Sequence, residues 1–273
     1  MKTNTLIFSI LFPFILFAQG TSSLEVINLT IIPSKFSVSE NKTDFYFIID
    51  ETNEIIKTNR YGKIQKLVGG FGWQKSQFHK PTEILSTSIE VFVCDYNNHR
   101  IQKFDRNLNF ISEFSNSNTE YPFEYPFSIA LSSKGDLFVL DSKNKKILKI
   151  NGFGKLEKVF GNYENAPVLF QNPMKLRIDS RQNLFVLDNN NLFIFDQFGN
   201  YRSQIKLTID DIIDFIPDED KIFLLLKDKL IVLRDNQISI FFQGQENEEF
   251  KQIEIRGDEL FLLTGDKLLL LKK

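Results

Sequence analysis

Residues 78–104 contain the stretch that decides the fold, FHKPTEILSTSIEVFVCDYNNHRIQKF. It has a Phe-x-x-Pro lead-in, a short apolar run, an apolar strand that ends in Asp95, and a polar turn before a third strand. The same phrase recurs at 123–150 and 170–195, and the successive prolines are 45 and 47 residues apart. A repeat of this length is typical of units that bury their hydrophobic faces only by stacking on neighbours.

The strand rhythm continues outside these three copies. Hairpins are predicted at 45–57 before them and at 222–233 and 260–271 after them. A further short strand precedes each hairpin, and a β-rich stretch follows each of the first five. The unit is therefore four antiparallel strands in about 38 to 48 residues, which is the blade of a β-propeller.

The two ends of the chain complement each other. The sixth unit ends at Lys273 after three strands, whereas residues 24–31 (LEVINLTI) form a spare strand ahead of the first complete unit. We therefore predict an all-β fold, a six-bladed β-propeller of four-stranded antiparallel blades whose ring is closed by the N-terminal strand completing the last blade. The alternative is a linear β-solenoid, which would not explain a missing strand at one end and an extra one at the other.

Three copies resemble the NHL repeat, a propeller family whose unit has a Phe-x-x-Pro lead-in and an Asp-x-x-Asn-x-Arg-Ile turn. The resemblance is carried by GGFGWQKSQFHKPTEIL (69–85) with VFVCDYNNHRIQKFD (91–105), and by YPFEYPFSIALSSKGDLFVLDSKNKKILKI (121–150). The third copy, FQNPMKLRIDSRQNLFVLDNNN (170–191), shortens the turn and loses its basic residue. The resemblance implies a six-bladed propeller but leaves the function open, because propellers of this type serve many roles.

The N-terminal residues resemble a secretory signal peptide. Lys2 precedes an apolar run over 6–17, and the small residues Ala18 and Gly20 follow it. An uncleaved anchor is the alternative, although about 12 apolar residues are few for a bilayer span. We expect a signal peptide at 1–20 and a single propeller domain at 21–273, monomeric and without a transmembrane segment after cleavage. The protein is then exported, either periplasmic or secreted.

Composition narrows the classes of partner. The 273 residues carry a formal net charge of −2 and no block of basic residues, so we expect no nucleic-acid partner. Cys94 is the only cysteine, which excludes an intrachain disulfide, and it is expected to be a small buried hydrophobe.

The residues that the copies share are expected to build the scaffold. Asp50, Asp95, Asp141 and Asp188 end strands, where a carboxylate can accept hydrogen bonds from turn amides two or three residues on. A carboxylate ring that binds a cation is the alternative. Arg100 is expected to pair with a carboxylate of a neighbouring blade. The residues expected to wedge between blades are Phe78, Pro81, Phe123, Pro126, Phe170 and Pro173.

A binding site is expected where the copies differ, because a site breaks the symmetry of a repeat scaffold. The lead-in loops differ in aromatic, amide and charged residues, and they should converge on one face around the central channel. Trp73, the only tryptophan, lies in a Gly-rich loop. The candidate binding residues of this loop face are Trp73, His79, Lys80, Tyr121, Glu124, Tyr125, Gln171 and Asn172.

The sequence favours a binding module over an enzyme. Its two histidines, His79 and His99, lie in loops of different kinds, whereas catalytic zinc generally needs three protein ligands. No Gly-x-Ser-x-Gly elbow, phosphate loop or metalloprotease histidine pair occurs. We expect an exported, non-enzymatic binding or scaffold module for a protein, peptide or glycan, with no catalytic residue, metal or cofactor. The alternative is a metal-dependent hydrolase of the gluconolactonase type, with Glu83, Asp179 and Asp214 as candidate ligands.

Overall fold

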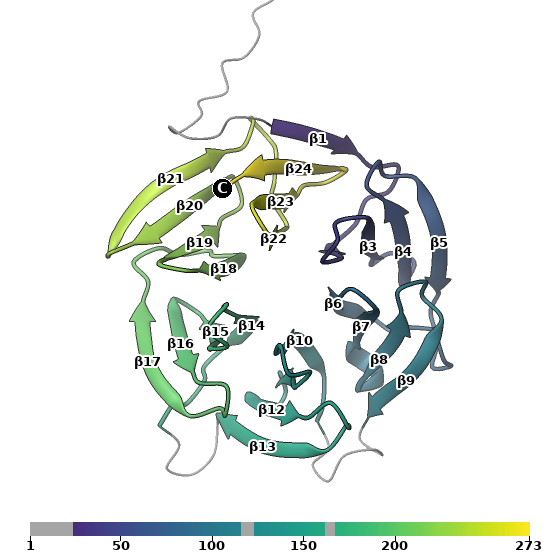
Figure 1. The fold of residues 1–273 in the computed structure, drawn as a ribbon, viewed down its shortest axis with the longest axis horizontal. Helices are drawn as coiled ribbons and strands as arrows, with labels where there is room; N and C mark the ends of the chain where they lie inside the picture. Colours follow the sequence, from purple (N-terminus) through teal and green to yellow (C-terminus); the bar gives the residue numbers. More distant parts are fainter. Residues whose placement is uncertain (1–23, 116–122, 162–166) are drawn as a thin grey trace, which may run out of the picture.

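The computed structural model describes residues 24–115, 123–161 and 167–273, which form 24 β-strands in six four-stranded sheets. The sheets are arranged as blades around a ring (Figure 1). Within these residues no helix is long and apolar enough to cross a membrane. The predicted six-bladed propeller is confirmed.

Five blades follow the chain order from the inner to the outer strand. Blade 1 contains β2 (Lys35–Val38), β3 (Asp44–Ile49), β4 (Glu54–Asn59) and β5 (Ile64–Gly69); blade 2 contains β6 (Pro81–Ser86), β7 (Glu90–Asp95), β8 (Arg100–Asp105) and β9 (Phe110–Ser115), with the 3-10 turn η1 (Tyr96–Asn98) between β7 and β8. Blade 3 contains β10 (Pro126–Leu131), β11 (Leu137–Asp141), β12 (Lys146–Ile150) and β13 (Leu156–Gly161); blade 4 contains β14 (Pro173–Ile178), β15 (Leu184–Asp188), β16 (Asn191–Phe195) and β17 (Tyr201–Lys206). Blade 5 contains β18 (Asp214–Asp218), β19 (Lys221–Leu225), β20 (Lys229–Arg234) and β21 (Gln237–Gln243).

Blade 6 joins the two ends of the described chain. It contains β22 (Gln252–Arg256), β23 (Glu259–Leu263) and β24 (Lys267–Lys272), and its outermost strand is β1 (Leu24–Asn28). The strands β1 and β24 run antiparallel, from the pair Leu24 with Leu271 to the pair Asn28 with Lys267. The expected closure by the N-terminal strand is thus confirmed, and the open solenoid is wrong.

The hydrophobic core lies between blades. In the described residues each pair of neighbouring blades shares one cluster of buried side chains. The lead-in residues Phe78, Phe123 and Phe170 are fully buried in the clusters between blades 1 and 2, 2 and 3, and 3 and 4. Each blade therefore covers its apolar face with the next blade, because a single sheet cannot cover both of its faces.

A glycine at the end of the outer strand makes room for two of these rings. Gly69 and Gly161 have φ values of 126° and 111°. A Cβ atom on Gly161 would lie 2.7 Å from the ring of Phe170, and one on Gly69 would lie 2.6 Å from the carbonyl oxygen of Asn53. Glycine is therefore required at these two positions, where the chain leaves blade 1 and blade 3.

The loops fall on two opposite faces. Pro81 and Arg100 both pair with Asp95, so the loop before β6 and the turn before β8 lie at the same end of the blade. We call this end of the propeller, with the corresponding loops of the other blades, the lead-in face. Turns between the first and second strands, such as 87–89, lie on the opposite face.

We expect the closing strand to contribute strongly to stability through one of its sides. Ile27 is buried against blade 1, whereas the neighbouring Val26 is 44% exposed. Replacing Ile27→Ala should lower the free energy of unfolding by about 2 kcal/mol, since it leaves a cavity in this cluster. The control Val26→Ala should stay within about 0.5 kcal/mol of the wild type. Urea unfolding followed by circular dichroism measures both, and equal losses would contradict a buried seam.

Cys94 provides a second test of the packing. The thiol is fully buried in the cluster between blades 2 and 3, and burial raises its pKa well above the usual value, with Glu83 raising it further. Because the thiolate is the reactive form, Cys94 should not react with Ellman's reagent in the folded protein. It should react fully in 6 M guanidinium chloride. Rapid reaction under native conditions would show that these two blades separate readily.

Candidate binding surface

The lead-in loop of blade 2 is held by its own backbone and by blade 1. The amide of Gly70 donates to the carbonyl of Asn53 at 2.9 Å. Within the loop, the Phe78 amide donates to Gly70 at 3.0 Å and the Gly72 amide donates to Phe78 at 3.1 Å. The residues between them therefore project from a closed, hydrogen-bonded loop.

Asp95 ties this loop to its own blade. Its buried carboxylate accepts hydrogen bonds from the His79 amide, the Asn98 side chain and the Arg100 Nε, each at 2.8 Å. Burial raises the pKa of Asp95, although these three donors lower it. The carboxylate thus orders both the lead-in loop and the following turn, which extends the expected role of a turn cap.

Arg100 pairs within its own blade, so the expected pairing with a neighbouring blade is wrong. Its guanidinium contacts Asp95 at 2.8 Å and Glu113 of the adjacent strand β9 at 3.1 Å. Its Nη2 also donates to the carbonyls of Gln74 and Gln77 at 2.9 and 3.0 Å. The side chain lies under the lead-in loop because Arg100 begins β8 at the end of the blade where this loop lies.

Two other repeat aspartates contact different partners. Asp141 accepts a hydrogen bond from the Asn144 amide at 3.1 Å and another from the Asn144 side chain at 2.8 Å, which is a turn cap. Asp50 does not end its strand as expected, because β3 stops at Ile49. It is exposed and accepts a hydrogen bond from the Ser34 hydroxyl at 2.6 Å.

Asp188 holds the lead-in loop of blade 4. Its carboxylate accepts hydrogen bonds from the amides of Gln171 and Asn172 at 2.7 and 2.5 Å. Both side chains are exposed. In the part of the chain that the structure describes, no hydrogen bond joins either of them to the loops of blades 2 and 3.

Aromatic side chains gather on the loop of blade 2. The ring of Phe71 lies 5.4 Å from Trp73 and 4.9 Å from His79, both in edge-on contact. Trp73 is 66% exposed and Phe71 is 57% exposed. Large exposed aromatic groups on an ordered loop are typical of recognition surfaces.

A second aromatic group lies beside the first, across blades 2 and 3. The ring of Tyr125 lies 4.3 Å from His99 and 4.9 Å from Tyr96, and Phe127 lies 6.0 Å from Tyr96. The Tyr125 amide donates to Nδ1 of His99 at 3.1 Å. Lys80 follows His79 in the chain and lies 5.0 Å above the Tyr96 ring, so it joins the two groups. We call this set the aromatic surface: Phe71, Trp73, His79, Lys80, Tyr96, His99, Tyr125 and Phe127.

The structure brings together half of the predicted binding residues. Trp73, His79, Lys80 and Tyr125 belong to the aromatic surface. Glu124 lies next to Tyr125 in the chain, and its ion pair with Lys143 at 2.6 Å lowers its pKa. Gln171 and Asn172 lie on the separate loop of blade 4, and Tyr121 lies outside the described residues.

Sequence reasoning missed four members of this surface, Phe71, Tyr96, His99 and Phe127. A signal was available for three of them. Tyr96 and His99 occupy the turn after the repeat aspartate, and Phe127 follows the repeat proline. No binding role was expected at these positions, although their side chains differ between copies.

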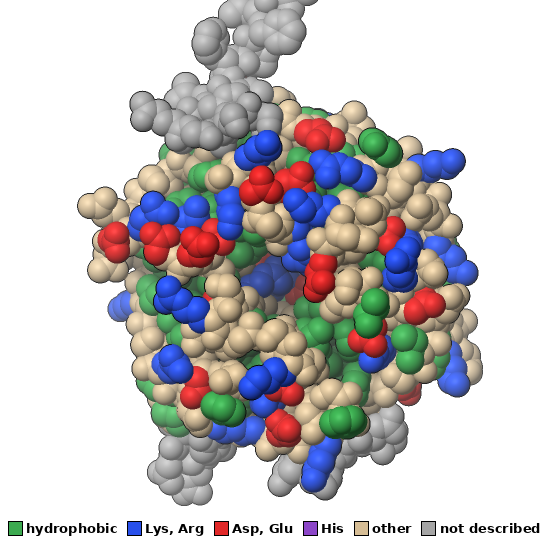
Figure 2. Space-filling model, in the orientation of Figure 1, with side chains coloured by type: hydrophobic (Ala, Val, Ile, Leu, Met, Phe, Trp, Pro, Cys, Tyr) green, Lys and Arg blue, Asp and Glu red, His purple; other side chains and the backbone are tan. Residues whose placement is uncertain are grey.

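The central channel opens on the face opposite the aromatic surface. A cavity of about 510 Å³ is lined there by the later halves of the inner strands, including Leu85, Arg177, Ile216 and Arg256. Figure 2 shows the hollow at the centre of this face, with basic side chains inside it. The lead-in loops therefore do not surround this cavity, because they precede the inner strands whose other ends line it.

The carboxylates considered as metal ligands have protein partners. Glu83 pairs with Lys175, and Asp214 contacts Nη2 of Arg177 at 2.7 and 3.0 Å. Asp179 accepts two hydrogen bonds from Asn183 in the turn after β14. Among the described residues, no group of three or more His, Cys, Asp or Glu side chains is arranged to hold a metal ion.

Comparison with known proteins supports the fold. No family model matches the sequence. The protein brain tumor of Drosophila melanogaster is 29% identical over 128 residues, which are 42% of this chain and 12% of that protein. The matched segment thus spans a small part of that relative.

Three solved structures align with most of this chain. Virginiamycin B lyase from Staphylococcus aureus has a TM-score of 0.63 at 17% identity, over 87% of this chain and 79% of that one. A catalytically inactive histidine-to-alanine variant of that lyase with quinupristin gives 0.60 at 17% identity, over 91% and 80%. YCF48 bound to D1 peptide gives 0.60 at 12% identity, over 95% and 99%. At these identities the likeness shows the propeller fold alone.

We expect Asp95 to be essential for the order of the lead-in loop. Asp95→Ala would leave the buried Arg100 without its shortest ion pair and should cost about 3 kcal/mol of unfolding free energy. As a control, Asp50→Ala, at the exposed aspartate that follows β3, should cost less than about 1 kcal/mol. Denaturant unfolding measures both, and equal costs would contradict the role given to Asp95.

Proposed function

We propose that the chain is an exported, non-enzymatic binding module of the NHL type, which recognises a peptide segment of a partner protein through the aromatic surface. The observation that carries this proposal is the exposure of Trp73 and Phe71 on a loop fixed by hydrogen bonds. Export is supported by the leader-like sequence of residues 1–20.

The order of the loop favours binding in energetic terms. A mobile loop would lose conformational entropy when a partner bound, and this loss would reduce the affinity. Here Asp95 and Arg100 already fix the loop in the free protein. Aromatic rings held in this way bury a large area at a small entropic cost, as the strongest contact residues of protein interfaces do.

One of the comparisons supports a peptide ligand. YCF48, which shares the fold, was solved with a peptide bound, and brain tumor matches part of the chain. The inactive lyase variant lacks one histidine, whereas both histidines of this chain belong to the aromatic surface on the face opposite the central cavity. A lyase-like reaction in the cavity would therefore need groups other than histidine.

A selection experiment tests the peptide-binding proposal. A phage-displayed peptide library is selected on residues 21–273, and the affinity of a labelled selected peptide is measured by fluorescence anisotropy. The double variant Trp73→Ala/Tyr125→Ala should bind at least about tenfold more weakly, because it removes one anchor from each aromatic group.

The matched control is Phe153→Ala. Phe153 is 98% exposed in the turn between β12 and β13, on the opposite face. The affinity of the Phe153→Ala variant for the peptide should stay within about twofold of the wild type. Unchanged binding by the double variant would refute the aromatic surface as the site. Binding of glycans on an array, with no peptide selected, would refute the peptide class.

A further inference from the structure

A ring of polar residues lines the start of the central channel. Each inner strand contributes one residue at the same register, which pairs with Ile48, Cys94, Leu140, Leu187, Leu225 and Leu263 of the second strands. The ring consists of Lys35, Glu83, Ser128, Lys175, Asp214 and Gln252. Because the inner strands surround the channel, these side chains lie close to one another around it. Polar and charged groups therefore occupy positions where apolar side chains would otherwise pack.

Most of these side chains have partners across the ring. Lys175 of blade 4 reaches Glu83 of blade 2, and the Ser128 hydroxyl between them donates to the same carboxylate at 3.1 Å. Asp214 of β18 pairs with Arg177, which lies in β14 two residues after Lys175. These contacts compensate two cations with two carboxylates.

Lys35 is different. Within the described residues its ammonium group makes no hydrogen bond and no ion pair. Burial lowers the pKa of Lys35, the nearby Lys175 lowers it further, and Glu83 opposes this effect. The half-buried side chain therefore brings into the channel a basic group that has no ion pair of its own.

The charged residues further along the channel, towards the rim, do not balance the charge of Lys35. Arg256 pairs with Glu254 at 3.1 Å, so that pair is neutral. At the rim, Lys273 pairs with Asp218 at 2.7 Å, and Glu40 is exposed to water. Below the rim, the described channel thus holds four basic side chains and three carboxylates, namely Lys35, Lys175, Arg177 and Arg256 against Glu83, Asp214 and Glu254. Glu40 also lines the cavity, at the rim, where water solvates its charge. A net positive charge in a poorly solvated interior is costly unless an anion compensates it.

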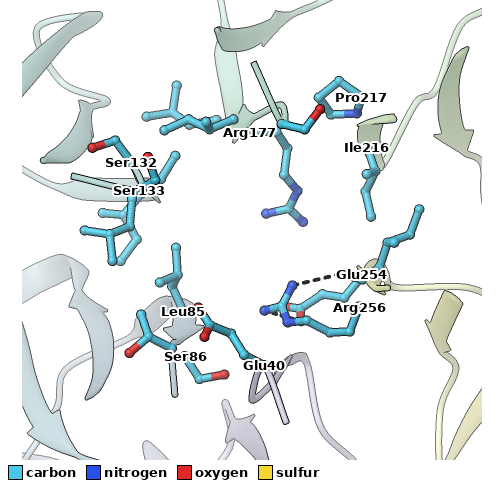
Figure 3. Close-up of a pocket in the computed structure, with 18 of the residues that line it drawn as sticks. Glu40, Leu85, Ser86, Ser132, Ser133, Arg177, Ile216, Pro217, Glu254 and Arg256 are labelled. Carbon is cyan, nitrogen blue, oxygen red and sulfur yellow. Dashed lines mark hydrogen bonds and ion pairs between the residues drawn. The ribbon is translucent and has the colours of Figure 1, made fainter. Parts of the chain in front are cut away.

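The cavity next to this cluster has the size and the donors to hold such an anion. Its volume of about 510 Å³ suits a small organic molecule. Figure 3 shows the guanidinium groups of Arg177 and Arg256 pointing into it from different strands. In the described part of the chain, Nη1 of Arg177 has no hydrogen-bond partner. Leu85, Ile216 and Pro217 give the wall apolar surface, and Ser132 and Ser133 add hydroxyl groups at the rim.

We propose that this cavity binds a small organic monocarboxylate, with its carboxylate between Arg177 and Arg256 and its apolar body against the wall. A planar guanidinium matches a carboxylate in shape and hydrogen-bonding geometry. A single negative charge neutralises the interior, whereas a phosphate dianion would reverse its sign. This site is independent of the aromatic surface, which lies on the other face.

Matched small molecules test the charge requirement. The melting temperature of residues 21–273 is measured with acetate, butyrate or benzoate, with benzamide as the neutral counterpart of benzoate, and with inorganic phosphate. At least one monocarboxylate should raise the melting temperature by about 2 to 4 °C at roughly 5 to 10 times its dissociation constant. Benzamide and phosphate should not. Failure of all three carboxylates at 50 mM, or an equal effect of benzamide, would overturn the proposal.

Two variants separate the contact from the net charge. Arg177→Lys keeps a cation beside Asp214 but loses the free Nη1, and it should weaken carboxylate binding by about tenfold in calorimetric titration. Lys35→Met breaks no hydrogen bond or ion pair with another described residue. It should raise the melting temperature without ligand and should also weaken carboxylate binding.

The control for the second variant is Lys134→Met, an exposed lysine on the same face as the cavity. Lys134→Met should leave both the melting temperature without ligand and the affinity for carboxylate unchanged. If Lys35→Met lowered the melting temperature and left carboxylate binding unchanged, Lys35 would be a structural residue and the charge argument would be wrong. If Arg177→Lys bound carboxylates as the wild type does, the assigned contact would be wrong.

Discussion

The fold depends on the burial of apolar strand faces between neighbouring blades. A four-stranded sheet has two faces, and each blade can cover only one face of its neighbour, so the stack is complete only when it returns to its start. The lead-in phenylalanines show how this is achieved locally. Phe78 lies in the segment that connects blade 1 to blade 2, and its buried ring fills the space between these two blades. The same segment of chain therefore joins two blades and packs them.

This packing also explains where the aromatic surface lies. The chain must bring its phenylalanine into the gap between blades, so the residues just before it are lifted onto the lead-in face. Asp95 and Arg100 then fasten that segment from below. The recognition loop is thus anchored by the hydrogen bonds that stabilise the blade, and loss of either anchor would affect both stability and binding.

The repeat made the fold predictable from sequence, because the proline spacing recurs in three blades and the strand rhythm in all six. The exposed aromatic loop was predicted in part for the same reason, since Trp73 and Tyr125 stand out where copies differ. The contacts around them were not predictable. Tyr96 and His99 meet Tyr125 across two blades, and the pairing follows from the placement of adjacent blades. The expected partner of Arg100 was wrong because spacing along the chain does not show which carboxylate lies beneath the loop.

The cavity also escaped sequence reasoning. The six residues of the polar ring belong to five residue types, and they are related only by register. In sequence, Lys35 and Lys175 have the pattern of ordinary strand lysines, and only the arrangement of the inner strands around a common axis brings them together. Repeat analysis finds what copies have in common, whereas this ring arises from one different side chain per blade.

Closure by β1 has a consequence for the order of events in folding. Of the described strands, β1 is synthesised before all the others and its partner β24 after them, so blade 6 can be completed only after β24 has left the ribosome. Until then, blades 1 and 6 present apolar faces with no cover, and chaperones or other copies of the chain could bind them. In the finished ring the same strand covers apolar surface of blades 6 and 1, so its release would expose both blades at once.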